Sequence, residues 1–282
     1  MKVILVVVLL SYYAEARTPT ENCIGATVIH NIKYEHEILK KLRIPYQLAM
    51  DYNTNTLFFS YSKDNKDIIY ESAYINLKTN EFGTIHGIAT GFANAVDEHG
   101  NVVYLGASDG IYQFNYETKV ATRLNGTDDT IWQLFFKKDL YYTKFPEEEI
   151  YIFKNNQSHR VPELIDTNGR FVAVDNSDNI YFSNTTGLFI HKKITDNTSF
   201  VGNYYDVNGF TYDINGALFF STPQAIYYIN DSIQEVEKIA SFDSLYGIAI
   251  EADGTIIYAL EDSLVRLKPT NTYCYSNETK NQ

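Results

Sequence analysis

Six apolar segments recur along this chain at nearly constant spacing, and this repeat constrains the fold more than any other feature. The segments end at positions 51, 97, 137, 175, 213 and 251, so the successive steps are 46, 40, 38, 38 and 38 residues. Fixed periods of this size mean that one supersecondary unit is arrayed several times. The six segments are YQLAMD (46–51), FANAVD (92–97), WQLFFK (132–137), RFVAVD (170–175), NGFTYD (208–213) and YGIAIE (246–251).

Each repeat continues with a polar turn and then short runs rich in aromatic and β-branched residues. Examples are TLFFS (56–60), LYYT (140–143), IYFS (180–183) and IYYI (226–229). Such runs are typical of strands, and no window sustains a helical period. Four short strands in about 40 residues, six times over, predict an all-β, six-bladed β-propeller of four-stranded antiparallel blades. A β-solenoid is the alternative architecture.

The two ends of the repeat array predict how the ring closes. No fourth strand follows the last apolar run, LVRL (264–267), whereas an unassigned stretch, Thr27–Leu42, precedes the first repeat. We expect this N-terminal segment to supply the outer strand that completes the last blade. Closure of this kind leaves no blade edge open to strand addition.

Residues 1–16 have the features of a secretory signal peptide. Lys2 precedes the apolar run VILVVVLL (3–10), and Ala14-Glu15-Ala16 provides a small-x-small cleavage site. An apolar run this short cannot span a bilayer, which takes about 20 residues. We therefore expect residues 17–282 to form a single, secreted propeller domain that does not associate with membranes.

Two cysteines, Cys23 and Cys274, flank the repeats. In an oxidising compartment an even number of cysteines favours pairing, so we expect one disulfide, with two free thiols as the alternative. Six Asn-x-Ser/Thr sequons are candidate sites for N-linked glycans, which lie on the surface where they are occupied. They are Asn125, Asn156, Asn184, Asn197, Asn230 and Asn277.

The composition argues against a nucleic-acid partner and against several kinds of catalysis. With 23 basic and 35 acidic residues the net charge is −12, which repels phosphate backbones. The sequence contains no GxSxG elbow, HExxH motif, P-loop or dinucleotide fingerprint, and its six histidines are scattered. The segment Asp51–Asn55 begins like a calcium loop but lacks the Gly and Glu that such a loop requires, so we interpret it as a blade turn.

A metal-dependent lactonase or esterase of the six-bladed propeller type is the enzymatic alternative. Enzymes of that group hold a divalent ion in the channel through Glu, Asn and Asp at the starts of the innermost strands. The corresponding positions here lie five residues before the end of each repeat segment, and only Asn208-Gly209 resembles the metal pattern. One amide cannot hold a hard cation that takes six or more oxygen ligands. We therefore expect no metal site, no cofactor and no catalytic residues.

The starts of the six innermost strands lie on one face of a propeller, so the same positions predict a ring of side chains around one channel mouth. We expect its aromatic members to stack against a planar aromatic ligand, its guanidinium to neutralise a carboxylate and its amide to hydrogen-bond. Plain filling of the channel by side chains and a protein-interaction scaffold are the alternatives. This mouth ring consists of Tyr46, Phe92, Trp132, Arg170, Asn208 and Tyr246. Neighbouring loops are expected to add Tyr61, Ser108, Asp109, Lys144, Phe145, Thr185, Gln224 and Glu261.

Long segments of the chain resemble the lepidopteran ommochrome-binding proteins, a family of secreted haemolymph pigment-binding proteins. The resemblance implies that the ligand is an ommochrome, such as xanthommatin or an ommatin, carried in the haemolymph of an insect. We therefore expect a monomeric, non-enzymatic carrier of a flat, conjugated pigment that bears carboxylates. The resemblance runs from Cys23 to about Cys274 and is carried by PYQLAMDYNTNTLFFSYS (45–62), GFANAVD (91–97), IWQLFFKKDLYYTKFPEE (131–148), FFSTPQAIYYIND (219–231), YGIAIEADG (246–254) and SLVRLKPT (263–270).

Overall fold

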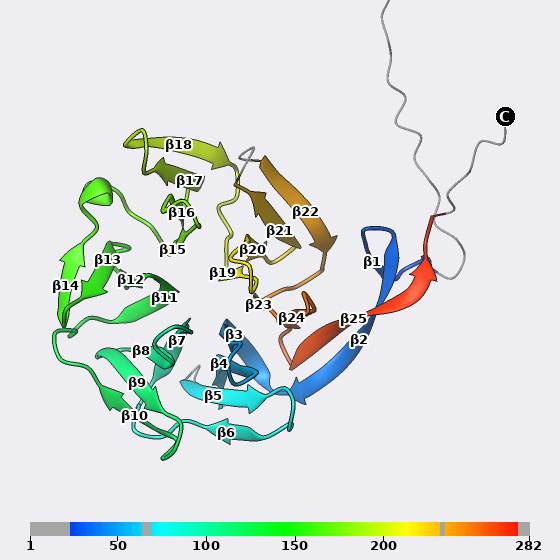
Figure 1. Cartoon of the computed structure of the whole chain (residues 1–282), viewed down its shortest axis with the longest axis horizontal. Helices are drawn as coiled ribbons and strands as arrows, with labels where there is room; N and C mark the ends of the chain where they lie inside the picture. Colours follow the sequence, from blue (N-terminus) through cyan, green and yellow to red (C-terminus); the bar gives the residue numbers. More distant parts are fainter. Residues whose placement is uncertain (1–22, 64–68, 232–234, 276–282) are drawn as a thin grey trace, which may run out of the picture.

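Six antiparallel sheets form a ring around a central axis, which confirms the predicted six-bladed β-propeller (Figure 1). The computed structural model describes residues 23–63, 69–231 and 235–275. The predicted signal peptide, residues 1–16, lies outside the described residues. Within the described ranges no helix is long and apolar enough to cross a membrane. A short 3₁₀ turn, η2 (Pro162–Leu164), lies between the third and fourth blades.

Blades 1 to 5 each consist of four strands that are consecutive in sequence, with the innermost strand first (Figure 1). Blade 1 contains β3 (Arg43–Asp51), β4 (Thr56–Ser62), β5 (Tyr70–Asn76) and β6 (Phe82–Thr84). Blade 2 contains β7 (Gly91–Asp97), β8 (Val102–Ala107), β9 (Gly110–Asn115) and β10 (Val120–Arg123). Blade 3 contains β11 (Ile131–Lys137), β12 (Asp139–Lys144), β13 (Ile150–Lys154) and β14 (Gln157–Arg160). Blade 4 contains β15 (Phe171–Val174), β16 (Ile180–Asn184), β17 (Gly187–Lys192) and β18 (Asn197–Gly202), and blade 5 contains β19 (Gly209–Tyr212), β20 (Leu218–Thr222), β21 (Ala225–Asn230) and β22 (Glu235–Ser241).

Blade 6 combines the two ends of the chain, as expected. A strand from the N-terminal segment pairs antiparallel with the last strand of the chain, for example through Ile38 opposite Val265. The ring is therefore closed by backbone hydrogen bonds between residues far apart in sequence. The strands are β23 (Gly247–Ile250), β24 (Ile256–Ala259), β25 (Ser263–Tyr273) and the N-terminal β2 (Ile32–Lys41).

The N-terminal segment also contributes a strand that was not expected. His30 and Asn31 both have positive φ, 46° and 68°, which is the backbone conformation of a two-residue hairpin turn. The segment Thr27–Leu42 is therefore divided, and β1 (Thr27–Ile29) folds back to pair with β2. Blade 6 consequently has five strands instead of four.

Cys23 and Cys274 form the expected disulfide, with 5.6 Å between their Cα atoms. Both cysteines are buried. The backbone N–H of Cys274 also donates to the carbonyl of Asn31 at 2.9 Å. The two ends of the propeller are therefore joined covalently as well as through the sheet of blade 6.

An aromatic residue in the second strand of most blades forms a repeated layer of the core. It occupies the third position of runs such as TLFFS and LYYT, and burial of one such side chain stabilises the fold by about 1.5–3 kcal/mol. This explains why the repeat keeps an aromatic residue there. In five blades the side chain is no more than 1% exposed: Phe58, Tyr142, Phe182, Phe220 and Tyr258.

The acidic residue that ends an inner strand caps the turn that follows it, on the face opposite the mouth ring. The carboxylate of Asp51 accepts a hydrogen bond from the backbone N–H of Asn53 at 2.9 Å. Asp175 and Asp213 accept equivalent hydrogen bonds two residues further on, at 2.8 and 2.9 Å. These are Asx turns, in which a side chain replaces a backbone acceptor. The segment Asp51–Asn55 is therefore a blade turn, as interpreted from the sequence.

The sequons differ in how accessible they are. Asn125, Asn156 and Asn197 are exposed, whereas Asn184 and Asn230 are partly buried. Asn277 lies outside the described residues. Glycan attachment stays a prediction at all six positions.

Candidate functional site

A cavity of about 420 Å³ opens at one mouth of the propeller channel. Three members of the mouth ring line it, namely Tyr46, Trp132 and Arg170, and so do two of the eight expected loop residues, Lys144 and Phe145. The other six expected loop residues do not line this cavity. Three of the six residues at the starts of the innermost strands therefore meet at one cavity, as the spacing of the repeat predicts. The other lining residues are Glu148, Phe171, Tyr205, Asp206, Val207 and Pro223.

Aromatic rings form a continuous wall from blade 1 to blade 3. The ring of Phe92 lies between those of Tyr46 and Trp132, with centroid distances of 5.2 and 4.9 Å. The indole of Trp132 also stacks on Phe145, with centroids 5.4 Å apart and planes inclined by 26°. Each contact of this kind contributes about 0.5–1.5 kcal/mol beyond burial. The wall is therefore a preformed apolar surface.

Hydrogen bonds from the neighbouring blade fix the backbone of the mouth ring. The hydroxyl of Ser60 in β4 donates to the carbonyl of Phe92, and the hydroxyl of Thr143 in β12 donates to the carbonyl of Arg170 at 2.8 Å. In blades 1 and 3 the hydroxyl near the end of the second strand therefore ties one blade to the next. The indole N–H of Trp132, in contrast, is buried and has no acceptor within the described ranges.

Phe145 and Tyr205 stand at the rim of the cavity with 52% and 50% of their surfaces exposed. Phe145 belongs to the loop between β12 and β13, and Tyr205 to the connection between β18 and β19. Half-exposed aromatic rings at a cavity rim lose unfavourable contact with water when a ligand covers them. These two rings therefore supply surface that a flat ligand can bury.

Sequence reasoning missed Tyr205 and its neighbours Asp206 and Val207. They follow an outer strand and precede the next inner strand, so they lie on the same face as the mouth ring. The expected loop residues were taken only from the loops between second and third strands. The repeat register contained the missing signal, because both kinds of connection lie on this face.

The cations at the cavity are paired with carboxylates of the protein. Arg170 Nε donates to Glu148 Oε1 at 2.6 Å. Lys144 Nζ lies 3.0 Å from Asp129 Oδ1 and 3.9 Å from Glu149 Oε2. Burial alone lowers the pKa of the Lys144 ammonium, but the hydrogen bonds and charges of Asp129 and Tyr151 together outweigh burial and raise the pKa above the ordinary lysine value. The Lys144 ammonium is therefore charged at neutral pH.

Two tyrosines next to the wall are uncharged at neutral pH. Burial, reinforced by the nearby Tyr70, raises the pKa of the Tyr46 phenol well above its ordinary value. Burial and the proximity of Tyr246 raise the pKa of Tyr70 in the same way. Tyr46 therefore lines the cavity as a neutral phenol, and the neutral ring of Tyr70 contacts Phe92 in the wall.

The other three members of the mouth ring do not line the cavity. Phe92 belongs to the aromatic wall through its contacts with Tyr46 and Trp132, and Tyr246 packs against a core cluster that includes Leu48. Both polar groups of Asn208 are engaged within the protein: Nδ2 donates to the carbonyl of Leu245 at 2.5 Å, and Oδ1 accepts from the hydroxyl of Ser221 at 2.6 Å. Asn208 therefore links blade 5 to blade 6.

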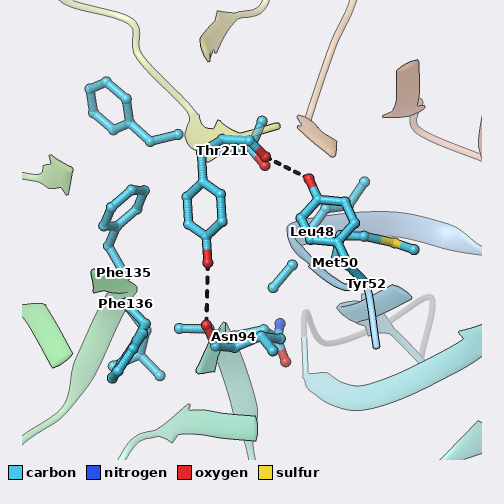
Figure 2. Close-up of a pocket in the computed structure, with 13 residues that line it drawn as sticks. Leu48, Met50, Tyr52, Asn94, Phe135, Phe136 and Thr211 are labelled. Carbon is cyan, nitrogen blue, oxygen red and sulfur yellow. Dashed lines mark hydrogen bonds between the residues drawn. The ribbon is translucent and has the colours of Figure 1, made fainter. Parts of the chain in front are cut away.

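Beneath the cavity the channel is closed by side chains. The hydroxyl of Tyr52 lies 2.8 Å from the carbonyl oxygen of Tyr212, and the hydroxyl of Tyr212 donates to the carbonyl of Val96 at 3.3 Å. The space left among Tyr52, Asn94 and Phe135 is about 30 Å³, enough for one or two water molecules (Figure 2). Channel filling, the alternative considered from the sequence, therefore applies to the middle of the axis and leaves the mouth open.

The residues present at the channel do not form an oxygen-rich ligand set. Within the described ranges no group of three or more His, Cys, Asp or Glu side chains is placed to hold a metal ion. Asn208, the one mouth-ring residue that resembles the metal pattern of propeller lactonases, already uses its amide oxygen for Ser221.

Comparison with models of known protein families gave no match. The chain is 37% identical over 250 residues to the ommochrome-binding protein of Manduca sexta, an alignment that covers 86% of this chain and 90% of that protein. The chain belongs to the ommochrome-binding protein family. Membership in this family confirms the resemblance found in the sequence.

Solved structures show how widely the fold of this ommochrome-binding family member is shared. The gluconolactonase XC5397 from Xanthomonas campestris matches with a TM-score of 0.69 at 12% identity, over 91% of this chain and 96% of the other. A streptogramin B lyase matches with a TM-score of 0.59 at 11% identity, over 84% of this chain and 98% of the other. At these identities the similarity shows the propeller fold alone.

Proposed function

We propose that this protein is a secreted, non-catalytic carrier that holds a planar aromatic pigment of the ommochrome class in the cavity at the channel mouth. The name of the Manduca sexta relative supports the ligand class. The predicted signal peptide and the disulfide support an extracellular location. The observation that carries the proposal is the preformed aromatic wall beside an open cavity.

The size and lining of the cavity suit a flat ligand. Its volume of about 420 Å³ falls within the range of small-molecule sites, roughly 300–1,000 Å³. A ring system placed between Phe145 and Tyr205 stacks on aromatic faces and covers their exposed surface. A pigment of about 30 heavy atoms at about 0.3 kcal/mol per atom binds with roughly −9 kcal/mol, which is a sub-micromolar Kd.

Polar groups at the wall fix the orientation of the pigment. The indole N–H of Trp132 is buried and lacks an acceptor among the described residues, so a ligand carbonyl or ring nitrogen satisfies it only if neighbouring side chains move aside. Arg170 donates to Glu148 through Nε, so its terminal amino groups serve a ligand carboxylate. Stacking supplies most of the affinity, and these contacts supply orientation.

Matched phenylalanine variants test the proposal. Phe145 and Phe200 are 52% and 54% exposed, and each has a ring partner at 5.4 Å, Trp132 and Phe189 respectively. Phe200 lies on the outer strand of blade 4, away from the cavity. We expect Phe145→Ala to raise the Kd for xanthommatin roughly tenfold in a calorimetric titration, since about 1.4 kcal/mol of stacking and burial is lost. Phe200→Ala should leave the Kd unchanged, and equal effects of the two substitutions would contradict the proposal.

Activity assays on the same purified protein distinguish a carrier from a lactonase or esterase. A carrier releases the pigment chemically unchanged, and its binding does not respond to chelation. Turnover of lactones or aryl esters that is lost with a chelator and restored by a divalent cation would contradict the carrier function.

A further inference from the structure

The charged side chains that line the cavity differ in whether they have a partner. There are four of them: Lys144, Glu148, Arg170 and Asp206. The two cations are neutralised inside the protein, Arg170 by Glu148 at 2.6 Å and Lys144 by Asp129 at 3.0 Å. A ligand carboxylate therefore has to share either cation with a carboxylate of the protein.

Asp206, by contrast, is an exposed carboxylate with no hydrogen bond or ion pair to any residue in the described part of the chain. It follows Tyr205, whose half-exposed ring lies at the same rim. A carboxylate next to an aromatic ring suits an ammonium group, because the cation gains an ion pair and a cation–π contact together.

We propose that Asp206 is a specificity residue that selects aromatic ligands bearing a protonated amine. The inference rests on the proposed function, because it concerns the same cavity. The amine donates to the Asp206 carboxylate while the ring system stacks on the wall that contains Trp132 and Phe145. The preferred ligand is therefore an aromatic amine or an aromatic amino acid, which carries both charges, and a purely acidic pigment binds less well. The net charge of −12 also favours binding of a ligand with a cationic group, because the negative potential of the protein attracts it.

Three fluorescent probes that share one flat ring system test this preference. They are 9-(aminomethyl)anthracene, its N-acetyl derivative and anthracene-9-carboxylic acid, which carry a positive, zero and negative charge. Their Kd values are measured by anisotropy at fixed ionic strength with the unaltered protein, with Asp206→Asn and with Asp243→Asn. Asp243 is a matched control, because it is also exposed, lies in the equivalent connection between blades 5 and 6, and lines a different groove.

The unaltered protein should bind the amine about fivefold more tightly than the amide, and the amide more tightly than the acid. Asp206→Asn should remove the advantage of the amine and leave the Kd of the amide unchanged, whereas Asp243→Asn should preserve the order. Charge-independent binding, a preference for the acid, or an unchanged order in Asp206→Asn would overturn the inference and leave the pigment site intact. If none of the probes and no xanthommatin bound the unaltered protein, the proposed function would fail, and the inference with it.

Discussion

The disulfide between Cys23 and Cys274 should contribute strongly to stability, because it closes most of the chain into one loop. Its two cysteines are separated by 251 positions. In the chain-entropy model, a cross-link across a loop of this length lowers the entropy of the unfolded chain by an amount worth about 5.5 kcal/mol at 25 °C. Domains are typically stable by only about 5–15 kcal/mol. Loss of this bond should therefore remove a large fraction of the free energy of unfolding.

The double variant Cys23→Ser/Cys274→Ser measures this contribution without leaving an unpaired thiol. We expect its free energy of unfolding in urea to fall by about 3–5 kcal/mol, since measured effects are often smaller than the entropy model predicts. The m value should rise, because the denatured chain without the cross-link exposes more surface. The pairing of β2 with β25 should still close the ring, so the native circular dichroism spectrum should persist without denaturant. An unchanged midpoint and an unchanged m value would refute the reasoning.

Two further substitutions test the assignments of polar residues. Asn208→Ala removes the hydrogen bonds to Leu245 and Ser221, so we expect the free energy of unfolding to fall by about 1–3 kcal/mol. The Kd for the pigment should change less than twofold, because Asn208 does not line the cavity. A large change in this Kd would show that Asn208 contacts the ligand. Burial, reinforced by the Asp51 carboxylate, raises the pKa of Glu98 from 4.5 to about 7. Ionised Glu98 therefore destabilises the folded state above about pH 7, and this cost disappears as the pH falls below 4.5, where the carboxyl is protonated in both states. We expect Glu98→Gln to stabilise the protein by about 1 kcal/mol at pH 8, after allowance for solvent screening, and to have no such effect at pH 4; equal denaturation midpoints of variant and unaltered protein at pH 8 would contradict the assignment.

The repeat in the sequence was sufficient to predict the number of blades, the strand order within them and the N-terminal strand that closes blade 6. These features follow from periodicity and from the lack of a fourth strand after the last apolar run, LVRL (264–267). The fifth strand of blade 6 depends on the two-residue turn at His30 and Asn31. Neither residue is glycine, and nothing in the repeat marks that position, so the positive φ angles could not be read from the pattern.

The mouth ring was predictable as a set of positions, but not in the direction of each side chain. Tyr46, Trp132 and Arg170 reach the cavity, whereas Asn208 turns to the carbonyl of Leu245 in the next blade. The reason is local: Ser221 in β20 holds the amide oxygen of Asn208 and fixes its orientation. The pairing of Arg170 with Glu148 likewise depends on the fold of the loop after β12, because the two residues are separated by 22 positions.

The central claim is that a flat aromatic ligand occupies the cavity at the channel mouth. A crystal structure of the protein grown with xanthommatin tests it most directly. The account predicts density for a ring system between Phe145 and Tyr205, in contact with Trp132, and burial of both rim rings relative to their present exposure. Pigment density at another surface, with only water at the mouth, would contradict the account.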